Sequence, residues 1–243
     1  MPLRALLYLG MFSLLSLLSA CASAPVAVPS ADSYLKEGDA AFASRKYEDA
    51  IASWKKVKES YSSPELTTQA ELKIADAHFE NKSYIEAAAA YEDFRKLHPG
   101  HEKSAYALYR MGLSHYFQVS GIDTDQTPVK NAVITLEGFL KLYPDSPHVD
   151  EVKQKLADCR IKQLEYENYV GNFYLRTEKY PAAIKRLSEA LERFPNTPKL
   201  DQTLFYLGKA HLKSGNTVQG REILKKLATE YPNSPLNAEA AKL

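Results

Sequence analysis

The chain has 243 residues, of which 45% are apolar and 25% charged, a composition typical of folded globular or repeat proteins. Its charges nearly cancel, with 31 Lys and Arg against 30 Asp and Glu. This balance gives no reason to expect nucleic acid or an anionic lipid surface as a partner. The composition therefore argues against the classes of protein that bind through a strong basic field.

Residues 1–20 have the pattern of a secretory signal. Arg4 is the only charged residue before Cys21, and an apolar run rich in Leu follows it. This run is too short to be read first as a membrane span. It ends in Leu18–Cys21 (LSAC), which resembles the lipobox of bacterial lipoproteins, where small residues precede a cysteine that receives a thioether-linked diacylglycerol. We expect cleavage before a lipidated Cys21; an ordinary signal peptide with a chance cysteine is the alternative.

The residues after Cys21 fit a lipid tether. Residues 21–30 are small, Pro-containing and uncharged, as in a linker between an anchor and a fold. No aspartate follows the cysteine, which in Gram-negative lipoproteins predicts export to the outer membrane. The covalent lipid is the only prosthetic group that we expect. With Cys21 lipidated, Cys159 is the one remaining cysteine, so no intrachain disulfide is predicted.

From Ala31 onward the chain repeats itself with the spacing of the tetratricopeptide template, which is 34 residues long. Large, small, aromatic and proline positions recur at that spacing. They predict an all-α fold over residues 31–243: a right-handed superhelical solenoid of five helix-turn-helix repeats. The five repeats are expected at about 31–64, 68–101, 104–147, 164–198 and 201–235.

Small residues recur where the two helices of each repeat should cross. A larger side chain there would overpack the crossing, at a cost of about 1–3 kcal/mol. One such position is filled by Gly38, Ala75, Gly112, Gly171 and Gly208, and the other by Ala50, Ala87, Ala132 and Ala183.

Two departures from the template are expected to shape the solenoid. The third repeat has eight extra residues within 119–128, where Gly, Asp, Thr and Pro predict a loop. Between the third and fourth repeats, residues 149–166 form a helical stretch with no hairpin partner of its own. We expect it to continue into the fourth repeat as one long helix.

No motif in the chain predicts catalysis or a metal centre. Ser-hydrolase, metalloprotease, phosphate-loop and dinucleotide-binding signatures are absent from the sequence, and so is a paired-Cys motif. His98 and His101 flank a Pro-Gly turn, but a metal would need further ligands that their sequence neighbours do not supply. An enzyme is therefore not expected, and we predict a protein that acts by binding.

The first helices of the first three repeats carry apolar and aromatic residues at positions expected to line a concave groove. Such a surface is typical of a peptide-binding groove. An equally good interpretation is that these residues pack against neighbouring helices or a folded-over tail. The candidate groove residues are Phe42, Phe79, Tyr109 and Tyr116, with Leu35, Leu72, Leu113 and Phe117 beside them.

These features together resemble the BamD family of outer-membrane protein assembly lipoproteins, over essentially the whole mature chain. The resemblance is carried by the lipobox, the five repeats, the insertion in the third repeat and the long helix. Its most specific stretches are Tyr106–Phe117 (YALYRMGLSHYF), Asp123–Pro128 (DTDQTP) and Leu164–Leu187 (LEYENYVGNFYLRTEKYPAAIKRL).

The resemblance implies a function and a set of partners. It implies a subunit of the complex that inserts β-barrel proteins, the BAM complex, anchored at the periplasmic face of the outer membrane. The C-terminal repeats would dock on a POTRA domain of the barrel subunit BamA, and the N-terminal repeats would receive the C-terminal signals of unfolded barrels. Arg186 matches a family arginine at the BamA contact, and Asp123 and Asp125 lie in the family's loop. Thr124 departs from the family, which often has Arg there, and so does Gly220, where Ala is usual.

Two other functions compete with this interpretation. A tetratricopeptide scaffold of the Tol-Pal or cell-division system, similar to the CpoB family, predicts a plain signal peptide, an N-terminal coiled coil and no insertion, and this sequence departs from all three. An envelope enzyme or peptidoglycan-binding lipoprotein would need a module for which no residues are left over.

Overall fold

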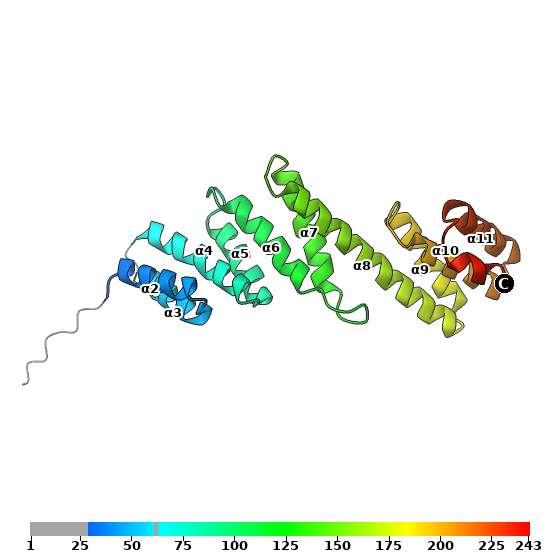
Figure 1. Cartoon of the computed structure of the whole chain (residues 1–243), viewed down its shortest axis with the longest axis horizontal. Helices are drawn as coiled ribbons and strands as arrows, with labels where there is room; N and C mark the ends of the chain where they lie inside the picture. Colours follow the sequence, from blue (N-terminus) through cyan, green and yellow to red (C-terminus); the bar gives the residue numbers. More distant parts are fainter. Residues whose placement is uncertain (1–28, 61–62) are drawn as a thin grey trace, which may run out of the picture.

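A computed structural model describes residues 29–60 and 63–243, which fold into helices joined by short turns (Figure 1). The expected signal, Cys21 and most of the tether lie outside the described residues. Within the described ranges there is no strand. The helices are α2 (Ala31–Ala43), α3 (Tyr47–Glu59), α4 (Pro64–Glu80), α5 (Tyr84–Leu97), α6 (Ser104–Phe117), α7 (Thr127–Leu142), α8 (Val149–Arg176), α9 (Tyr180–Arg193), α10 (Leu200–Lys213), α11 (Thr217–Glu230) and α12 (Leu236–Ala240).

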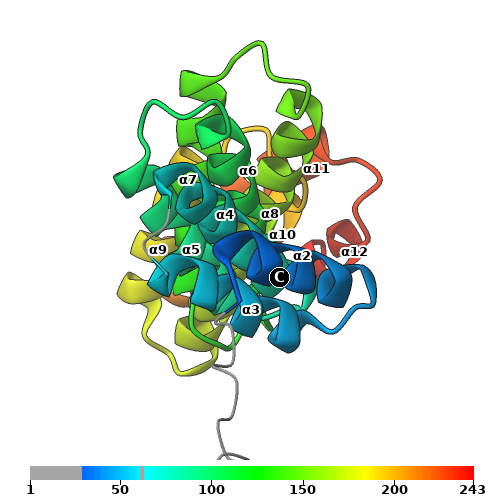
Figure 2. The same cartoon turned by 90° about the vertical axis from the view of Figure 1, so that its left-hand side faces the viewer.

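Successive helices pack side by side into an elongated stack. Each helix contacts the next one along the chain, from α2 and α3 to α10 and α11, and the two ends of the stack lie far apart (Figure 1). Figure 2 looks along this stack from the N-terminal end, with α2 and α3 in front. Each of the five expected repeat segments holds one helix pair. The predicted fold class, an all-α tetratricopeptide-repeat solenoid, is confirmed.

The crossing positions are as small as the sequence predicts, because the partner helix touches them. A Cβ atom added to Gly38 would lie 2.3 Å from Trp54 Nε1, and one added to Gly171 would lie 2.5 Å from Leu187 Cδ2. In the fifth repeat, a Cβ on Gly220 would meet Leu212 at 2.7 Å and the backbone oxygen of Gly208 at 3.0 Å. The glycine at 220 therefore fits the close approach of α10 and α11.

Four of the five repeats turn between their helices in the same way. Two residues after the first helix ends, the backbone enters the left-handed region: Arg45 (φ 58°), Lys82 (φ 61°), Glu178 (φ 60°) and Gly215 (φ 88°). A left-handed residue reverses the chain just after a helix. In the third repeat the insertion takes the place of this turn, and it spans 118–126 between α6 and α7. Helix α7 begins at Thr127, earlier than expected, because a proline in the first turn of a helix loses no hydrogen bond.

Helix α8 joins the third and fourth repeats as one continuous helix of 28 residues, about 42 Å long at 1.5 Å per residue. Its contacts run to α6 and α7 on one side and to α9 and α10 on the other. The prediction of a single long helix is confirmed. The short helix α12, which the sequence analysis did not predict, packs on α10 and α11.

Candidate binding surfaces

The predicted groove residues are partly or fully buried by packing against other helices, whereas an open groove would leave them exposed. Phe42 is partly buried, with its ring edge-on to Tyr47 at 5.5 Å and tilted against Trp54 at 5.7 Å. Phe79 is also partly buried, and the guanidinium of Arg110 lies 3.6 Å from its ring centroid. Phe42 therefore packs α2 against α3 within the first repeat, whereas Phe79 joins the first helices of the second and third repeats.

Tyr109 is a core residue, so its predicted place in the exposed groove is wrong. Its exposed fraction is 7%, its ring stacks on His148 at 4.0 Å, and its hydroxyl donates to Glu151 at 2.6 Å. Leu113 is buried as well. The cause is the extra first half of α8 and the turn before it, which cover α6 where a regular superhelix would leave it open.

Tyr116 remains half-buried at the end of α6 and is held by α8. Its hydroxyl donates to Asp158 at 3.2 Å, and Lys155 Nζ lies 4.6 Å from its ring centroid. Tyr116 also belongs to an aromatic cluster at the insertion side of the solenoid, in which Phe117 stacks on Tyr84 at 5.2 Å and remains 44% exposed.

A cleft of about 830 Å³ lies along the first half of α4, and we call it the α4 cleft. Its walls combine cationic, anionic and apolar side chains of α4 with the turn before α6. The lining residues are Pro64, Glu65, Leu66, Thr68, Gln69, Leu72, Lys73, Asp76, His101, Glu102 and Lys103.

Asp76 in the α4 cleft is the centre of a hydrogen-bond network between the second and third repeats. Its Oδ1 accepts from the hydroxyls of Tyr91, at 2.5 Å, and Tyr106, at 2.8 Å. Burial raises the pKa of Asp76, and the two hydroxyl donors and Arg110 oppose that rise. Arg110 donates in turn to the Tyr91 hydroxyl at 3.2 Å and to Glu80 at 2.7 Å. Sequence reasoning missed this network, since its members lie 15 and 30 residues apart from Asp76.

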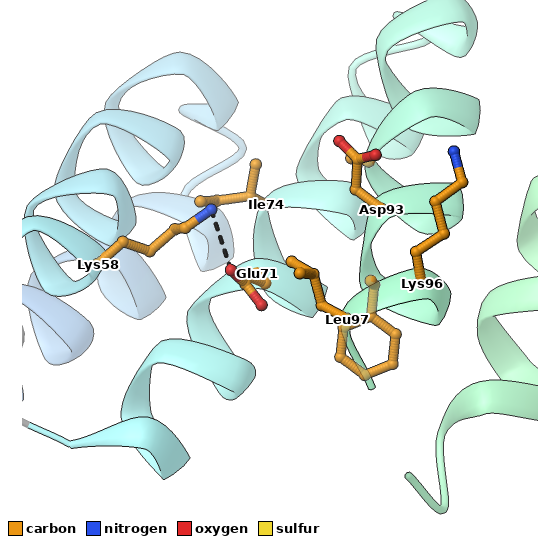
Figure 3. Close-up of a pocket in the computed structure, with 8 residues that line it drawn as sticks. Lys58, Glu71, Ile74, Asp93, Lys96 and Leu97 are labelled. Carbon is orange, nitrogen blue, oxygen red and sulfur yellow. Dashed lines mark ion pairs between the residues drawn. The ribbon is translucent and has the colours of Figure 1, made fainter. Parts of the chain in front are cut away.

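A second, smaller cleft of about 330 Å³ lies where α3, α4 and α5 meet (Figure 3). One of the two acids in this cleft, Glu71, has a side-chain partner on each carboxylate oxygen. Lys58 Nζ lies 3.1 Å from one carboxylate oxygen, and His98 Nε2 lies 2.6 Å from the other. Leu97 is 63% exposed at the edge of this cleft.

The two acids of the insertion loop, Asp123 and Asp125, are both exposed. Asp125 Oδ1 accepts from the backbone N–H of Thr127 at 2.9 Å and from its hydroxyl at 2.8 Å. These hydrogen bonds lower the pKa of Asp125. Asp125 thus fixes the start of α7, whereas Asp123 is exposed within the loop.

Arg186 lies in a cleft of about 230 Å³ between the start of α7 and helices α8 and α9. It is paired with Glu167, whose side chain is only 9% exposed, and Glu167 also binds Arg193 at 3.2 Å. The Arg186 guanidinium lies 5.6 Å from the ring centroid of Tyr166. Residues of α8 thus hold Arg186 in place. Arg186 is not an isolated, exposed charge on the surface of α9.

The Arg186 cleft carries an excess of positive charge. Three cations, Lys130, Arg186 and Arg193, line it with the single acid Glu167. Gln126, the last residue of the insertion, lines it too. The structure therefore brings the end of the insertion next to Arg186, but the groove residues on α2, α4 and α6 belong to other surfaces. Glu167 lies within Leu164–Leu187, one of the stretches that carry the resemblance, yet nothing in its sequence neighbours indicates the pairing with α9.

His98 and His101 turn to different partners. His98 contacts Glu71, while His101 Nδ1 accepts from the backbone N–H of Lys103 at 3.1 Å. The described part of the chain contains no group of three or more His, Cys, Asp or Glu side chains placed to hold a metal ion. Across 29–60 and 63–243, no helix has the length and apolar character needed to cross a bilayer.

The fold and these surfaces define a class: a tetratricopeptide-repeat protein with separate clefts in its N-terminal and C-terminal repeats. Solved repeat structures align with it loosely. The TPR2AB domain of yeast Sti1, in a pHSP90 complex, has a TM-score of 0.42 and 16% identity over 84% of this chain and 78% of that one. The protein TTC0263 of Thermus thermophilus has a TM-score of 0.37 and 14% identity over 88% of this chain and 100% of that one.

The sequence defines the family more narrowly. Residues 27–222 match the YfiO family, described as Outer membrane lipoprotein. The outer membrane protein assembly factor BamD of Rickettsia prowazekii is 27% identical over 82% of this chain and 79% of its own length. BamD of Vibrio cholerae is 29% identical over 46% of this chain, and the match spans about half (51%) of that relative. Because the family match covers most of the chain, the chain belongs to this family, as the resemblance predicted.

Proposed function

We propose that this chain is the tetratricopeptide lipoprotein of a β-barrel assembly machinery. In this role it docks on a BamA-like barrel subunit through its C-terminal repeats and receives the C-terminal signals of unfolded outer-membrane proteins in its N-terminal repeats. The support is the family match over residues 27–222 and the relatives named outer membrane protein assembly factor. A protein of this kind acts by binding, without chemistry of its own.

The proposed anchor is the lipid on Cys21, at the periplasmic face of the outer membrane. The first described helix begins with a defined cap: the Ser30 hydroxyl accepts from the backbone N–H of Ser33 at 3.2 Å. The expected tether of residues 21–30 therefore ends where the solenoid starts. A tether of this length would keep the repeats close to the membrane surface.

The observation that best supports the docking proposal is the ion pair between Glu167 and Arg186. A buried carboxylate fixes the guanidinium in the mouth of a cleft that has two further cations. An arginine side chain that is already held in place loses less conformational entropy when a partner acid binds it. We infer that the cleft meets an acidic surface on a POTRA domain, with Asp123 and Asp125 on the adjoining insertion.

Replacing Arg186 by Glu tests this docking. The variant should recover at least tenfold less of the barrel subunit on co-purification, since a like charge placed against an acidic surface weakens binding. Lys185→Glu is the matched control, because Lys185 precedes Arg186 on α9, carries the same charge and is 78% exposed. Co-purification that is equal in the two variants would remove Arg186 from the interface.

A further inference from the structure

The carboxylate of Asp76 has an oxygen that its own chain leaves free. Both tyrosine hydroxyls donate to Oδ1, and no group in residues 29–60 or 63–243 forms a hydrogen bond with Oδ2. A carboxylate can accept about four hydrogen bonds. Asp76 lines the α4 cleft, so the unused accepting capacity lies at a surface that a ligand can reach.

Glu71, on the opposite side of the same helix, differs from Asp76 because each of its two carboxylate oxygens has a side-chain partner. Lys58 and His98 occupy its two oxygens, and its role is accounted for by holding α3, α4 and the end of α5 together. Asp76 holds its neighbours through one oxygen only. The second oxygen is therefore not needed to join the repeats.

The cations near Asp76 have other partners, and Lys103, which also lines the α4 cleft, lies 3.8 Å from Glu102. Lys73, one turn earlier on α4, pairs with Asp39 at 2.9 Å and lies 5.5 Å from the Trp54 ring centroid. Arg110 donates to Tyr91 and Glu80. Asp76 is thus a partly buried carboxylate without a direct ion pair, and a hydrogen-bond donor brought by a ligand would be charge-assisted.

We propose that Asp76 Oδ2 accepts a main-chain N–H of an extended peptide bound in the α4 cleft. This rests on the proposed function and names the residue that holds the backbone of the unfolded client. An extended segment has unpaired backbone N–H groups and side chains that alternate in direction. The cleft supplies a matching set: the acceptor Asp76 for the backbone, and Leu66 and Leu72 as apolar contacts for alternate side chains.

The test is a binding measurement with a defined probe. A fluorescein-labelled ten-residue peptide from the C-terminal strand of an outer-membrane barrel, ending in Phe, is titrated with the mature chain and followed by fluorescence anisotropy. Asp76→Asn keeps the volume but removes the charge, and should weaken binding about tenfold or more, as expected for a charge-assisted hydrogen bond. Asp93→Asn is the matched control, because Asp93 is exposed and lines the other cleft, beside Glu71.

A second measurement leaves the protein unaltered, so it stays informative if Asp76→Asn folds poorly. Each backbone nitrogen of the peptide is methylated in turn. One position should lose about tenfold in affinity for the wild-type chain, and the same methylation should cost little in Asp76→Asn. A wild-type chain that binds the peptide with no such position, or an affinity unchanged by Asp76→Asn, overturns the role of Asp76 alone. If the wild-type chain does not bind the peptide at all, the proposed reception of clients fails with it.

Discussion

The N-terminal and C-terminal parts of the solenoid use one repeat design but satisfy their polar groups differently. In α4 and α6, Asp76 and Arg110 join the repeats through tyrosine hydroxyls, and one carboxylate oxygen is left over. In α8 and α9, the buried Glu167 is fully used by two arginines, and the surplus is positive charge. The N-terminal part therefore offers an unpaired carboxylate oxygen, on Asp76, and the C-terminal part an excess of cations around Arg186. These opposite charges suit two different ligands on one scaffold.

The largest expected effect on stability comes from interrupting α8, the helix that spans both parts. Lys162→Pro places a proline in the interior of α8, where the lost hydrogen bond and the ring clash cost about 3 kcal/mol or more. The N-terminal and C-terminal parts should then unfold in two separate urea transitions, followed by circular dichroism.

Lys162→Ala is the control, because it keeps the helix and removes the same side chain. It should unfold at the wild-type midpoint. If Lys162→Pro also gives one transition at that midpoint, α8 is not the element that couples the two parts.

How far the sequence predicts this structure depends on the range of the interactions. The crossings at Gly38 and Gly171 follow from the size of local residues, and the continuous α8 agrees with the absence of proline from residues 149–176, so both could be predicted. The burial of Tyr109 was not, since it depends on His148 and Glu151 reaching back over α6. Pairings such as Glu167 with Arg193 join residues that only the fold brings together.

The helix crossings should show that the two parts obey the same packing rule. Gly38→Ala and Gly171→Ala each introduce a Cβ that would lie within 2.5 Å of the facing side chain, so each should lower the free energy of unfolding by about 1–3 kcal/mol. Equilibrium denaturation in urea measures both.

Gly138→Ala is the matched control, because no atom lies within 4 Å of its added Cβ. Since alanine is the better helix former, this variant should gain about 0.5–1 kcal/mol. A loss as large as that of Gly171→Ala would mean that the close crossings are not what requires glycine.

The smallest expected effect is a difference in acid sensitivity. Burial lowers the pKa of His78 and His115 in the N-terminal part and of His211 in the C-terminal part. Below a pH of about 6.5, the unfolded chain then binds more protons than the folded chain. Stability should therefore be complete above that pH and fall as the pH drops toward the lowered values, more in the N-terminal part with its two histidines.

Hydrogen exchange at pH 7.5 and 5.0 measures this difference region by region. The loss of protection in α4 to α7 should exceed that in α9 to α11, and His115→Asn should reduce it. An equal loss in the two regions, with no effect of His115→Asn, would contradict the assignment of acid sensitivity to these buried rings.

The central claim is that the two parts of the solenoid serve different ligands, and a double dissociation of Asp76→Asn and Arg186→Glu tests it most directly. Both variants are measured in two assays, the dissociation constant for the barrel C-terminal peptide and the co-purification of the barrel subunit. The account predicts that Asp76→Asn weakens only peptide binding and that Arg186→Glu weakens only co-purification. If either substitution weakened both to the same extent while the thermal unfolding midpoint stayed unchanged, the two surfaces would be one site and the account would be wrong.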